Sequence, residues 1–486
     1  MKSRQPWLLA RRRWLVVVGA SLLGAVIAAL AGVGAPHPTG THGDLALAGQ
    51  VRAQIADDAG FASLSVARVT TTQITWAGLG SPTPTGGELT EQTPYPLGSI
   101  TKTFDGLLLA DAITRGEVRP QQRLETLLPT LADSPAGGVT LDELASHRSG
   151  LPRLAPSDGW GALLFVLTLR DPYRLSPQAL IAEARDVQLS GRGEVAYSNF
   201  GAALLGHALA VAAHAPDWPT LVRQRIWAPL GMTDTSIATT PDRVPAGAVV
   251  ERTASGARPQ TWTNDGDAPA GSSTWTTAAD LARYAQAILL AKVPGMSALD
   301  GRWPVPEGKI GLFWFSGEVE NRQLTWHDGG VAGARTMLVL DRSAGLAYVV
   351  LGSSDRSVED IGLGLITGRP AQSRPGLPIT GLVVLLVTLT ALGSVLHGLA
   401  KPGHRVGVVG DAVLGLAMLV LLFRVGPWAV IPGWVFGLVA GAAAGLIALA
   451  GPRWRDLTAP RHPIRAGLGV AFAALVLGVV CWGLLR

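Results

Sequence analysis

Ser99 and Lys102 are three residues apart in the stretch PLGSITKTF, which leads into an apolar run. On a helix, residues with this spacing share one face, so the lysine amine can reach the serine hydroxyl. A serine hydroxyl is a weak nucleophile until a neighbouring base takes its proton. Lysine serves as that base only where burial or nearby positive charge lowers its pKa. The spacing indicates a candidate nucleophile and base, although an ordinary helix start with a solvated lysine has the same pattern.

Two later stretches contain groups that an activated serine needs. EVAYSNFG holds Tyr197, whose phenol can pass a proton, and Asn199, whose amide can fix a lysine and hold a substrate carbonyl. TWHDGGVAG holds His327, Gly329 and Gly330. Glycines in a strand let a ligand approach the backbone, and a strand N–H group can complete an oxyanion site. The alternatives are an ordinary core aromatic for the tyrosine and a hairpin turn for the glycine pair.

Taken in this order, the three stretches resemble the serine beta-lactamase and penicillin-binding-protein superfamily. The closest resemblance is to the beta-lactamase-related serine hydrolases near the class C enzymes, which carry Ser-x-x-Lys, Tyr-x-Asn and Lys/His-x-Gly in this order. Three intervening segments, LDELASHRSGLPRL, IWAPLGMTDT and IGLFWF, are also similar to family segments. The resemblance extends from about residue 50 to residue 366 and implies the fold and the activity of that family.

The resemblance also implies a role for each polar residue. Ser99 attacks a carbonyl and becomes acylated, while Lys102 and Tyr197 relay protons. Asn199 orients Lys102 and the substrate. His147, in the segment ASHRSGLP, is interpreted as a structural residue that orients a loop near the site.

The third motif carries two departures from typical beta-lactamases. His327 replaces a lysine beside the tyrosine, as in related D-Ala-D-Ala peptidases, D-aminopeptidases and esterases. Asp328 stands where a hydroxyl often helps to bind a substrate carboxylate, and a carboxylate there would repel an anionic substrate. The resemblance assigns the oxyanion hole to the backbone N–H groups of Ser99 and Gly330, with Gly329 keeping the strand edge accessible. An ester or neutral amide is therefore expected at least as much as a penicillin.

Elements that could position these residues are visible in the apolar patterns. Strand patterns occur near both ends of the central region, at 61–69, 71–78, 322–329, 334–341 and 345–352. Helical patterns lie between them, including 99–116 and 199–215, and a closing helix is predicted at 358–366. This order predicts an α+β domain of the beta-lactamase/transpeptidase type, with an antiparallel sheet, flanking helices and a helical subdomain.

Hydrophobic residues make up 48% of the 486-residue chain and charged residues only 15%. The apolar excess gathers in five stretches, at 14–35, 377–399, 406–423, 428–450 and 466–485. Each approaches the length that a helix needs to cross a bilayer. The basic loops between them fall on the same side as Arg11, Arg12 and Arg13, as the positive-inside rule requires. The sequence therefore predicts a multi-pass protein of the cell membrane whose central domain lies on the extracytoplasmic side.

The predicted domain order is a signal anchor or signal peptide at 1–35, a linker at 36–48, a hydrolase domain at 49–368, a linker at 369–376 and four transmembrane helices within 377–486. Gly437, Gly441 and Gly445 in the third of these helices have the spacing of a small-residue packing face. That face would pack either within the bundle or between two copies of the chain.

We expect a membrane-anchored serine hydrolase that forms an acyl-enzyme at Ser99 with a cell-wall D-amino-acid peptide, another amide or a small ester. Specificity is expected in the segments 153–190 and 238–275. The alternative is a catalytically inactive binding or sensor module on the same fold, coupled to the membrane helices.

Neither His-Glu-x-x-His nor Cys-x-x-Cys occurs, so no metal or cofactor is expected. Basic residues beside the apolar stretches explain the net charge of +5 without a nucleic-acid partner, and the oligomeric state stays open.

Overall fold

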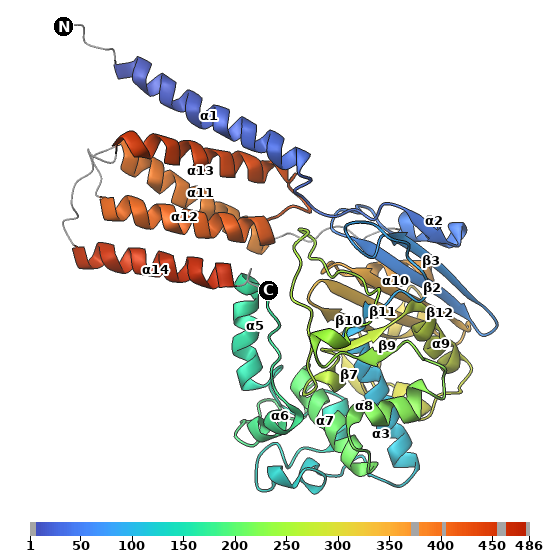
Figure 1. Ribbon diagram of the computed structural model, residues 1–486. Helices are drawn as coiled ribbons and strands as arrows, with labels where there is room; N and C mark the ends of the chain where they lie inside the picture. The colour runs from blue at the N-terminus through green and yellow to red at the C-terminus, as the bar shows by residue number, and fades with distance from the viewer. Residues whose placement is uncertain (1–5, 371–378, 401–404, 454–462, 483–486) are drawn as a thin grey trace, which may run out of the picture.

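A computed structural model describes residues 6–370, 379–400, 405–453 and 463–482. Its centre is an antiparallel sheet in the order β1-β3-β2-β12-β11-β10-β9-β8-β7 (Figure 1). The strands are β1 Thr41–Gly43, β2 Ser63–Thr70, β3 Ile74–Gly80, β7 Trp303–Val305, β8 Gly308–Ile310, β9 Phe315–Val319, β10 Arg322–Val331, β11 Ala334–Asp341 and β12 Leu346–Ser353. Because β2 pairs with β12, the sheet joins the beginning and the end of the domain, as predicted.

Helices cover both faces of the sheet. On one face, α2 (Leu45–Ala53) and α10 (Glu359–Thr367) pack on residues such as Val339 of β11. On the other, α3 (Lys102–Thr114) and α9 (Ala278–Leu289) pack on residues such as Leu338. Successive strand residues point to opposite faces, so a strand buried on both sides is apolar throughout. All of α3 except its last two residues is buried, which places its lysine inside the protein.

A helical subdomain lies beside the α3 face of the sheet. Its helices are α4 Leu141–Ala145, α5 Pro156–Thr168, α6 Pro177–Ala184, α7 Asn199–Ala212 and α8 Trp218–Val222. A small sheet in the order β4-β6-β5 connects this region to the residues before α3. Its strands are β4 Tyr95–Pro96, β5 Ser236–Ile237 and β6 Thr274–Thr276. The predicted α+β architecture, with an antiparallel sheet and a helical subdomain, is confirmed.

The predicted linker at 36–48 is wrong in its second half, which belongs to the folded domain. β1 pairs with β3 at the edge of the sheet, and α2 begins immediately afterwards. Asp44 caps this helix by accepting a hydrogen bond from the Leu47 backbone N–H at 2.7 Å. The strand escaped prediction because its Thr-His-Gly sequence has no apolar alternation and is held by backbone pairing. In the second predicted linker, residues 371–376 lie outside the described residues.

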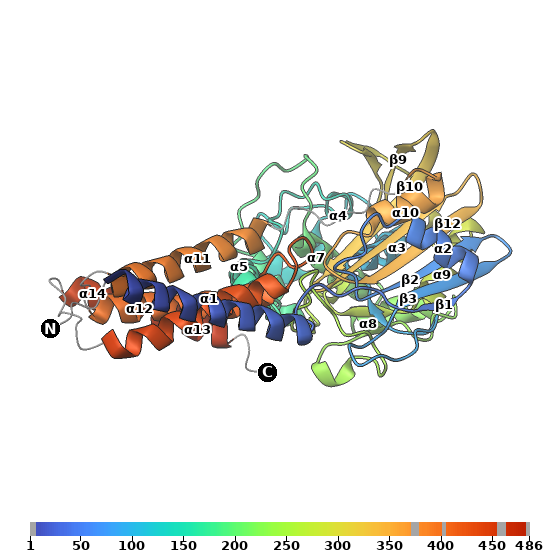
Figure 2. The same ribbon diagram turned by 90° about the horizontal axis from the view of Figure 1, so that it is seen from above.

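Five apolar helices form a bundle at one end of this domain (Figures 1 and 2). They are α1 Pro6–Leu30, α11 Ile379–Ala400, α12 Arg405–Val425, α13 Trp434–Arg453 and α14 Pro463–Trp482. Among the described residues, Ile379–His397 and Val406–Val425 are long and apolar enough to cross a membrane, whereas the apolar parts of the other three are shorter. The predicted third C-terminal span began too early: α13 starts at Trp434, after Pro432 and Gly433. Similarly, α1 ends at Leu30, before the predicted limit at residue 35.

Helix α1 packs along the glycine face of α13. A Cβ atom on Gly441 would lie 2.1 Å from the Ala20 carbonyl oxygen, and one on Gly437 would lie 2.1 Å from the Gly24 carbonyl oxygen. Only a residue without a side chain lets two helix backbones approach this closely. The glycine spacing seen in the sequence therefore serves packing within the bundle.

Gly441→Leu is expected to separate α1 from α13, because the new side chain would overlap the Ala20 carbonyl group. Overpacking of this kind destabilises by about 1 to 3 kcal/mol. We expect a lower midpoint of thermal unfolding for the full chain in detergent. Gly478→Leu in α14 is the matched control, since no atom lies within 4 Å of a Cβ there. Equal midpoints for the two variants would contradict this packing.

Candidate active site

Ser99 lies in a one-turn 3-10 helix, Gly98–Thr101, that leads from β4 into α3. Gly98 has a φ of +63°, a left-handed conformation that favours glycine. One turn later, Lys102 Nζ donates hydrogen bonds to Ser99 Oγ at 2.9 Å and to the Ala270 carbonyl oxygen at 2.6 Å. The predicted nucleophile and base are therefore in direct contact.

The Lys102 side chain is completely buried, unlike that of a lysine at an ordinary helix start. Burial removes the water that would stabilise the ammonium form, and this lowers the pKa of Lys102 to about 7. Asp105, Asp328 and Asp267 oppose the change, but loss of solvation is the larger effect. At neutral pH a large share of Lys102 is thus a neutral amine, which can accept the proton of Ser99.

Tyr197 shares this buried space. Burial raises its pKa above the ordinary value, and a hydrogen bond with Ser99 acts in the opposite direction. Lys102 Nζ lies 5.1 Å from the centroid of its ring, and the Arg153 guanidinium carbon lies at the same distance. Its phenol is therefore protonated at neutral pH and can donate a proton beside Ser99.

His147 holds the segment that contains Tyr197. The Ser198 N–H donates to His147 Nδ1 at 3.2 Å, and the Ala196 N–H donates to the His147 carbonyl oxygen at 2.7 Å. The His147 and Tyr197 ring centroids are 4.3 Å apart. Burial keeps the pKa of His147 well below its ordinary value, so the ring is neutral and Nδ1 can accept. This arrangement agrees with the structural role interpreted from the sequence.

Asn199 lies at the start of α7 and lines the same cavity as Ser99. Its side-chain N–H group donates to the Tyr173 hydroxyl at 3.4 Å. Lys102 instead bonds to the carbonyl of Ala270, a residue that the sequence did not single out. Any residue type has a backbone carbonyl, so the sequence carries no signal for this contact. A substrate-binding role for Asn199 stays a prediction.

Strand β10 leaves one edge open beside the nucleophile. It pairs with β11 as far as Val331, but its pairing with β9 ends at Trp326. A strand edge without a partner presents N–H and C=O groups to a ligand. The predicted residues His327, Gly329 and Gly330 all follow this end of the pairing, on the open part of the edge.

The open edge and the nucleophile turn are in backbone contact. A Cβ on Gly98 would lie 2.5 Å from the Gly330 nitrogen, and one on Gly329 would lie 2.3 Å from the Leu97 carbonyl oxygen and 3.2 Å from the Ser99 nitrogen. Thr336 of β11 fixes the turn further by donating to the same Leu97 carbonyl at 2.7 Å. The backbone segments that carry the Ser99 and Gly330 amide groups are therefore packed against each other, and their role as an oxyanion hole stays a prediction.

His327 is buried, and burial lowers its pKa to about 4. Its Nδ1–H donates to the Asp328 carbonyl oxygen at 2.5 Å, which fixes the neutral tautomer. The ring lies beside Phe315, with 5.6 Å between centroids. A lysine at position 327 would bring a positive charge, whereas the neutral histidine brings none. The Asp328 side chain lines the cavity. Position 327 therefore lacks the positive charge that a lysine would provide, and among the described residues the cationic groups that line the cavity are those of Arg153 and Arg335.

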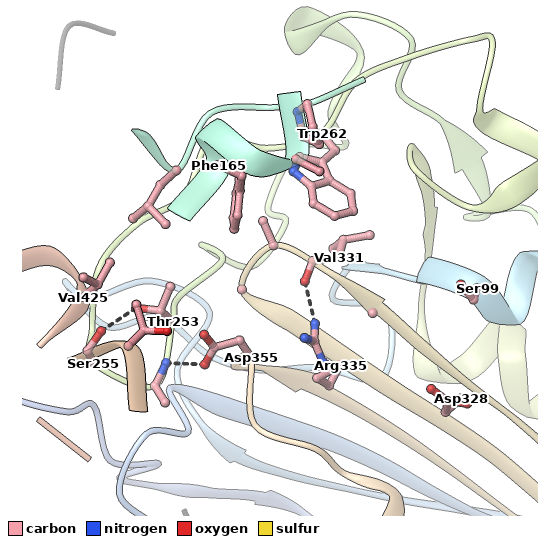
Figure 3. Close-up of a pocket in the computed structure, with 18 of the residues that line it drawn as sticks. Ser99, Phe165, Thr253, Ser255, Trp262, Asp328, Val331, Arg335, Asp355 and Val425 are labelled. Atoms are coloured by element: carbon pink, nitrogen blue, oxygen red, sulfur yellow. Dashed lines mark hydrogen bonds between the residues drawn. The ribbon is translucent and has the colours of Figure 1, made fainter. Parts of the chain in front are cut away.

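A cavity of about 1030 Å³ opens from these residues. Ser99 lies toward one end and Val425 toward the other, with Phe165 and Trp262 on one side and Arg335 and Asp355 on the opposite side (Figure 3). Much of its wall comes from 153–173 and 253–262, parts of the two segments in which specificity was expected. Sequence reasoning identified the segments but none of their individual lining residues, since no pattern marked them.

A buried lysine against a serine, beside an open strand edge of an antiparallel sheet, defines an acyl-transfer type of site. The chain belongs to the beta-lactamase family, whose model matches residues 49–364, more than half of the chain. Solved structures with the same fold include a class C beta-lactamase from Rhodobacter sphaeroides, with a TM-score of 0.54 and 20% identity over 63% of this chain and 95% of that one. Another is the D-alanine carboxypeptidase AmpC from Burkholderia cenocepacia, with a TM-score of 0.55 and 20% identity over 67% and 99% of the two chains.

Curated relatives match shorter parts. The D-alanyl-D-alanine-carboxypeptidase/endopeptidase AmpH of Escherichia coli is 32% identical over 162 residues, which are 33% of this chain and 40% of that protein. The unguisins hydrolase ungD' of Aspergillus campestris is 23% identical over 306 residues, 57% of this chain and 56% of that protein. The chain thus spans about half the length of these relatives.

Proposed function

We propose that this protein is a serine hydrolase that cleaves an ester or amide through an acyl-enzyme at Ser99. The observation that carries the proposal is the fully buried Lys102, in hydrogen-bond contact with Ser99 and with a pKa of about 7. A surface lysine would be charged and unable to accept a proton at neutral pH. The names of the relatives, which include a carboxypeptidase/endopeptidase and a hydrolase, support the same reaction class.

In the proposed first step, Lys102 takes the hydroxyl proton as Ser99 Oγ forms a bond to the substrate carbonyl carbon. Backbone N–H groups of Ser99 and Gly330 stabilise the resulting oxyanion. The bond to the leaving alcohol or amine then breaks, and Tyr197 gives its proton to the departing atom while it takes up the proton that Lys102 removed from Ser99. The acyl group remains on Ser99 as an ester.

In the second step, water attacks that ester, and Tyr197 takes the water proton as it passes its own phenolic proton to the neutral Lys102. The Ser99–carbonyl bond breaks, the proton returns to Oγ, and a carboxylic acid leaves. Asn199 would hold the substrate from the cavity wall. Substrates that fit are a neutral ester or amide, or a D-alanyl-D-alanine peptide of the kind in the name of AmpH. The neutral His327 and the lining Asp328 support the uncharged class, whereas Arg153 and Arg335 in the same cavity would accept a substrate that carries a carboxylate.

We place this domain outside the cell membrane, held by α1 and the four C-terminal helices. Two of these helices are long and apolar enough to span, α1 packs on α13, and the basic loops follow the positive-inside rule. In this arrangement α1 acts as a retained anchor, residues 49–368 form the hydrolase domain, and residues 377–486 form the membrane part.

The test is intact-mass analysis of the full chain in detergent after treatment with a small fluorophosphonate. One adduct on the wild type and none on Ser99→Ala is the expected result, with near-complete loss of labelling because no other nucleophile replaces the hydroxyl. A labelled penicillin is tested in parallel. Labelling by it would indicate a penicillin-binding peptidase, and its absence would indicate an esterase or amidase. A folded wild-type protein without an adduct would contradict the proposal and favour a non-catalytic binding module.

A further inference from the structure

The far end of the cavity is formed by the apolar helix bundle. Ile379 and Gly381 at the start of α11, and Val425 and Ala429 at and just beyond the end of α12, line it together with Ser99. These are ends of the two helices that are long and apolar enough to cross a membrane. The cavity therefore extends from the nucleophile to the level at which a bilayer would begin.

The side of the cavity contributed by α5 and the loop near Trp262 is apolar. Ala162, Phe165 and Leu169 line it, and the Phe165 and Trp262 rings meet edge to face with centroids 6.1 Å apart. The opposite side carries Arg335 and Asp355 (Figure 3). A space with one apolar and one polar side matches a molecule that has both a hydrocarbon chain and a polar group.

The outer face of α5 is apolar as well. Trp160 is 72% exposed, Leu163 64% and Leu164 44%, on the helix whose other face lines the cavity. Helix α5 contacts α14 and stands beside the end of the bundle (Figure 1). Tryptophan and leucine at the end of a membrane bundle are typical of a segment that lies in the membrane interface.

Among the described residues, the hydrogen bonds of Arg424 and Ser255 link the domain to the bundle. The side chain of Arg424, in the last turn of α12 and only 5% exposed, donates to the carbonyl of Thr168, the last residue of α5, at 2.7 Å. The Ser255 hydroxyl donates to the Arg424 carbonyl oxygen at 3.0 Å. Both contacts join segments of the cavity wall to the bundle, so the helix ends are held at the far end of the cavity.

We infer that the substrate is an amphiphile of the membrane: its hydrocarbon chain enters the cavity between α5 and the ends of α11 and α12, and its ester or amide carbonyl reaches Ser99. The inference rests on the proposed function, which it narrows to long-chain substrates. The apolar side accommodates the chain, and Arg335 and Asp355 face the polar part.

The test compares ethyl and hexadecyl fluorophosphonates on the full chain in lipid nanodiscs. Each forms a bond between Ser99 Oγ and phosphorus and releases fluoride, so intact mass gives a labelling rate for both. We expect the hexadecyl probe to react about tenfold faster or more, since each buried methylene adds about 0.8 kcal/mol. Because a long probe also concentrates in the lipid, variants must show that the cavity causes the difference.

Ala162→Trp would fill the cavity beside α5 and is expected to lower the ratio of the hexadecyl to the ethyl labelling rate about tenfold. Leu163→Trp, on the exposed face of the same helix, is the matched control and should change neither rate. Ala429→Trp would fill the end of the cavity that the helix bundle forms. It replaces Ala162→Trp as the test variant if Ala162→Trp misfolds and loses ethyl labelling. Equal rates for both probes, or a hexadecyl rate unaffected by both blocking variants, would overturn the inference. If neither probe labels the protein, the proposed function is refuted instead.

Discussion

Replacing Lys102 by methionine is expected to abolish acylation of Ser99 while making the folded protein more stable. The variant removes the proton acceptor, and loss of a general base typically lowers the rate by about 10²- to 10⁴-fold. Lowering the pKa of Lys102 from 10.5 to about 7 costs the folded state roughly 4 kcal/mol near neutral pH, at about 1.4 kcal/mol per pKa unit. Methionine avoids this cost but loses two hydrogen bonds of about 1 kcal/mol each, which leaves a gain of about 2 kcal/mol.

The pH dependence of both effects follows from the same pKa. In the unfolded chain Lys102 binds its proton up to about pH 10.5, and in the folded chain only up to about pH 7. The unfolded state therefore holds more protons between these values, and wild-type stability rises with pH across that window. The advantage of methionine is largest below pH 7 and shrinks toward pH 10.5. The wild-type acylation rate should rise with pH to a plateau, with a midpoint near 7.

Chemical denaturation at several pH values, together with fluorophosphonate labelling rates from pH 5 to 9, measures these effects. Lys309→Met removes an exposed lysine and serves as the matched control, since neither its stability nor its labelling rate should change. A wild-type labelling rate without an inflection near pH 7, or a less stable Lys102→Met protein, would show that this lysine is not held as a neutral base.

Gly329→Ala is expected to lower the acylation rate by roughly 10²- to 10³-fold, the usual cost of a lost oxyanion contact. The added carbon would lie 2.3 Å from the Leu97 carbonyl oxygen and 2.2 Å from the Thr336 hydroxyl oxygen. The backbone cannot rotate away as a flexible side chain can, so the strand and the nucleophile turn must move apart. That movement separates the Ser99 and Gly330 amide groups from the positions that serve one oxyanion.

Labelling rates of Gly329→Ala and Gly49→Ala provide the comparison. Gly49 lies on the exposed side of α2, and no atom lies within 4 Å of a Cβ there. The control should label like the wild type and keep or slightly gain stability, because alanine is the better helix former. If Gly329→Ala were to label at the wild-type rate, the strand edge would not belong to the acylation site.

The sequence allowed the main elements and the central pair to be predicted because both are local patterns. Alternation revealed the strands that became β2, β10, β11 and β12, and the spacing of Ser99 and Lys102 placed them on one helical face. Burial of Lys102 could not be predicted, since it depends on elements packed from distant parts of the chain. The family resemblance assigned His327 its position, but only the fold shows that burial keeps it neutral.

Backbone contacts escaped prediction for a different reason. The Ala270 carbonyl that binds Lys102 belongs to a residue 168 positions away, and its side chain has no part in the contact. Likewise β1 is three residues long, and pairing with β3, more than any side-chain pattern, makes it a strand. The late start of α13 was signalled by Pro432 and Gly433, which break a helix even inside an apolar run.

The pairing of β2 with β12 has a consequence for how the enzyme would meet its substrate. Because the first and last long strands of the domain are neighbours, the chain comes from α1 and departs toward α11 near the same place. In the proposed membrane arrangement, two tethers at one end would remove the tumbling that a single flexible tether permits. A substrate that diffuses laterally in the lipid would meet the active site within a two-dimensional surface, with both molecules already oriented. Binding would then remove less translational and rotational freedom than an encounter in free solution.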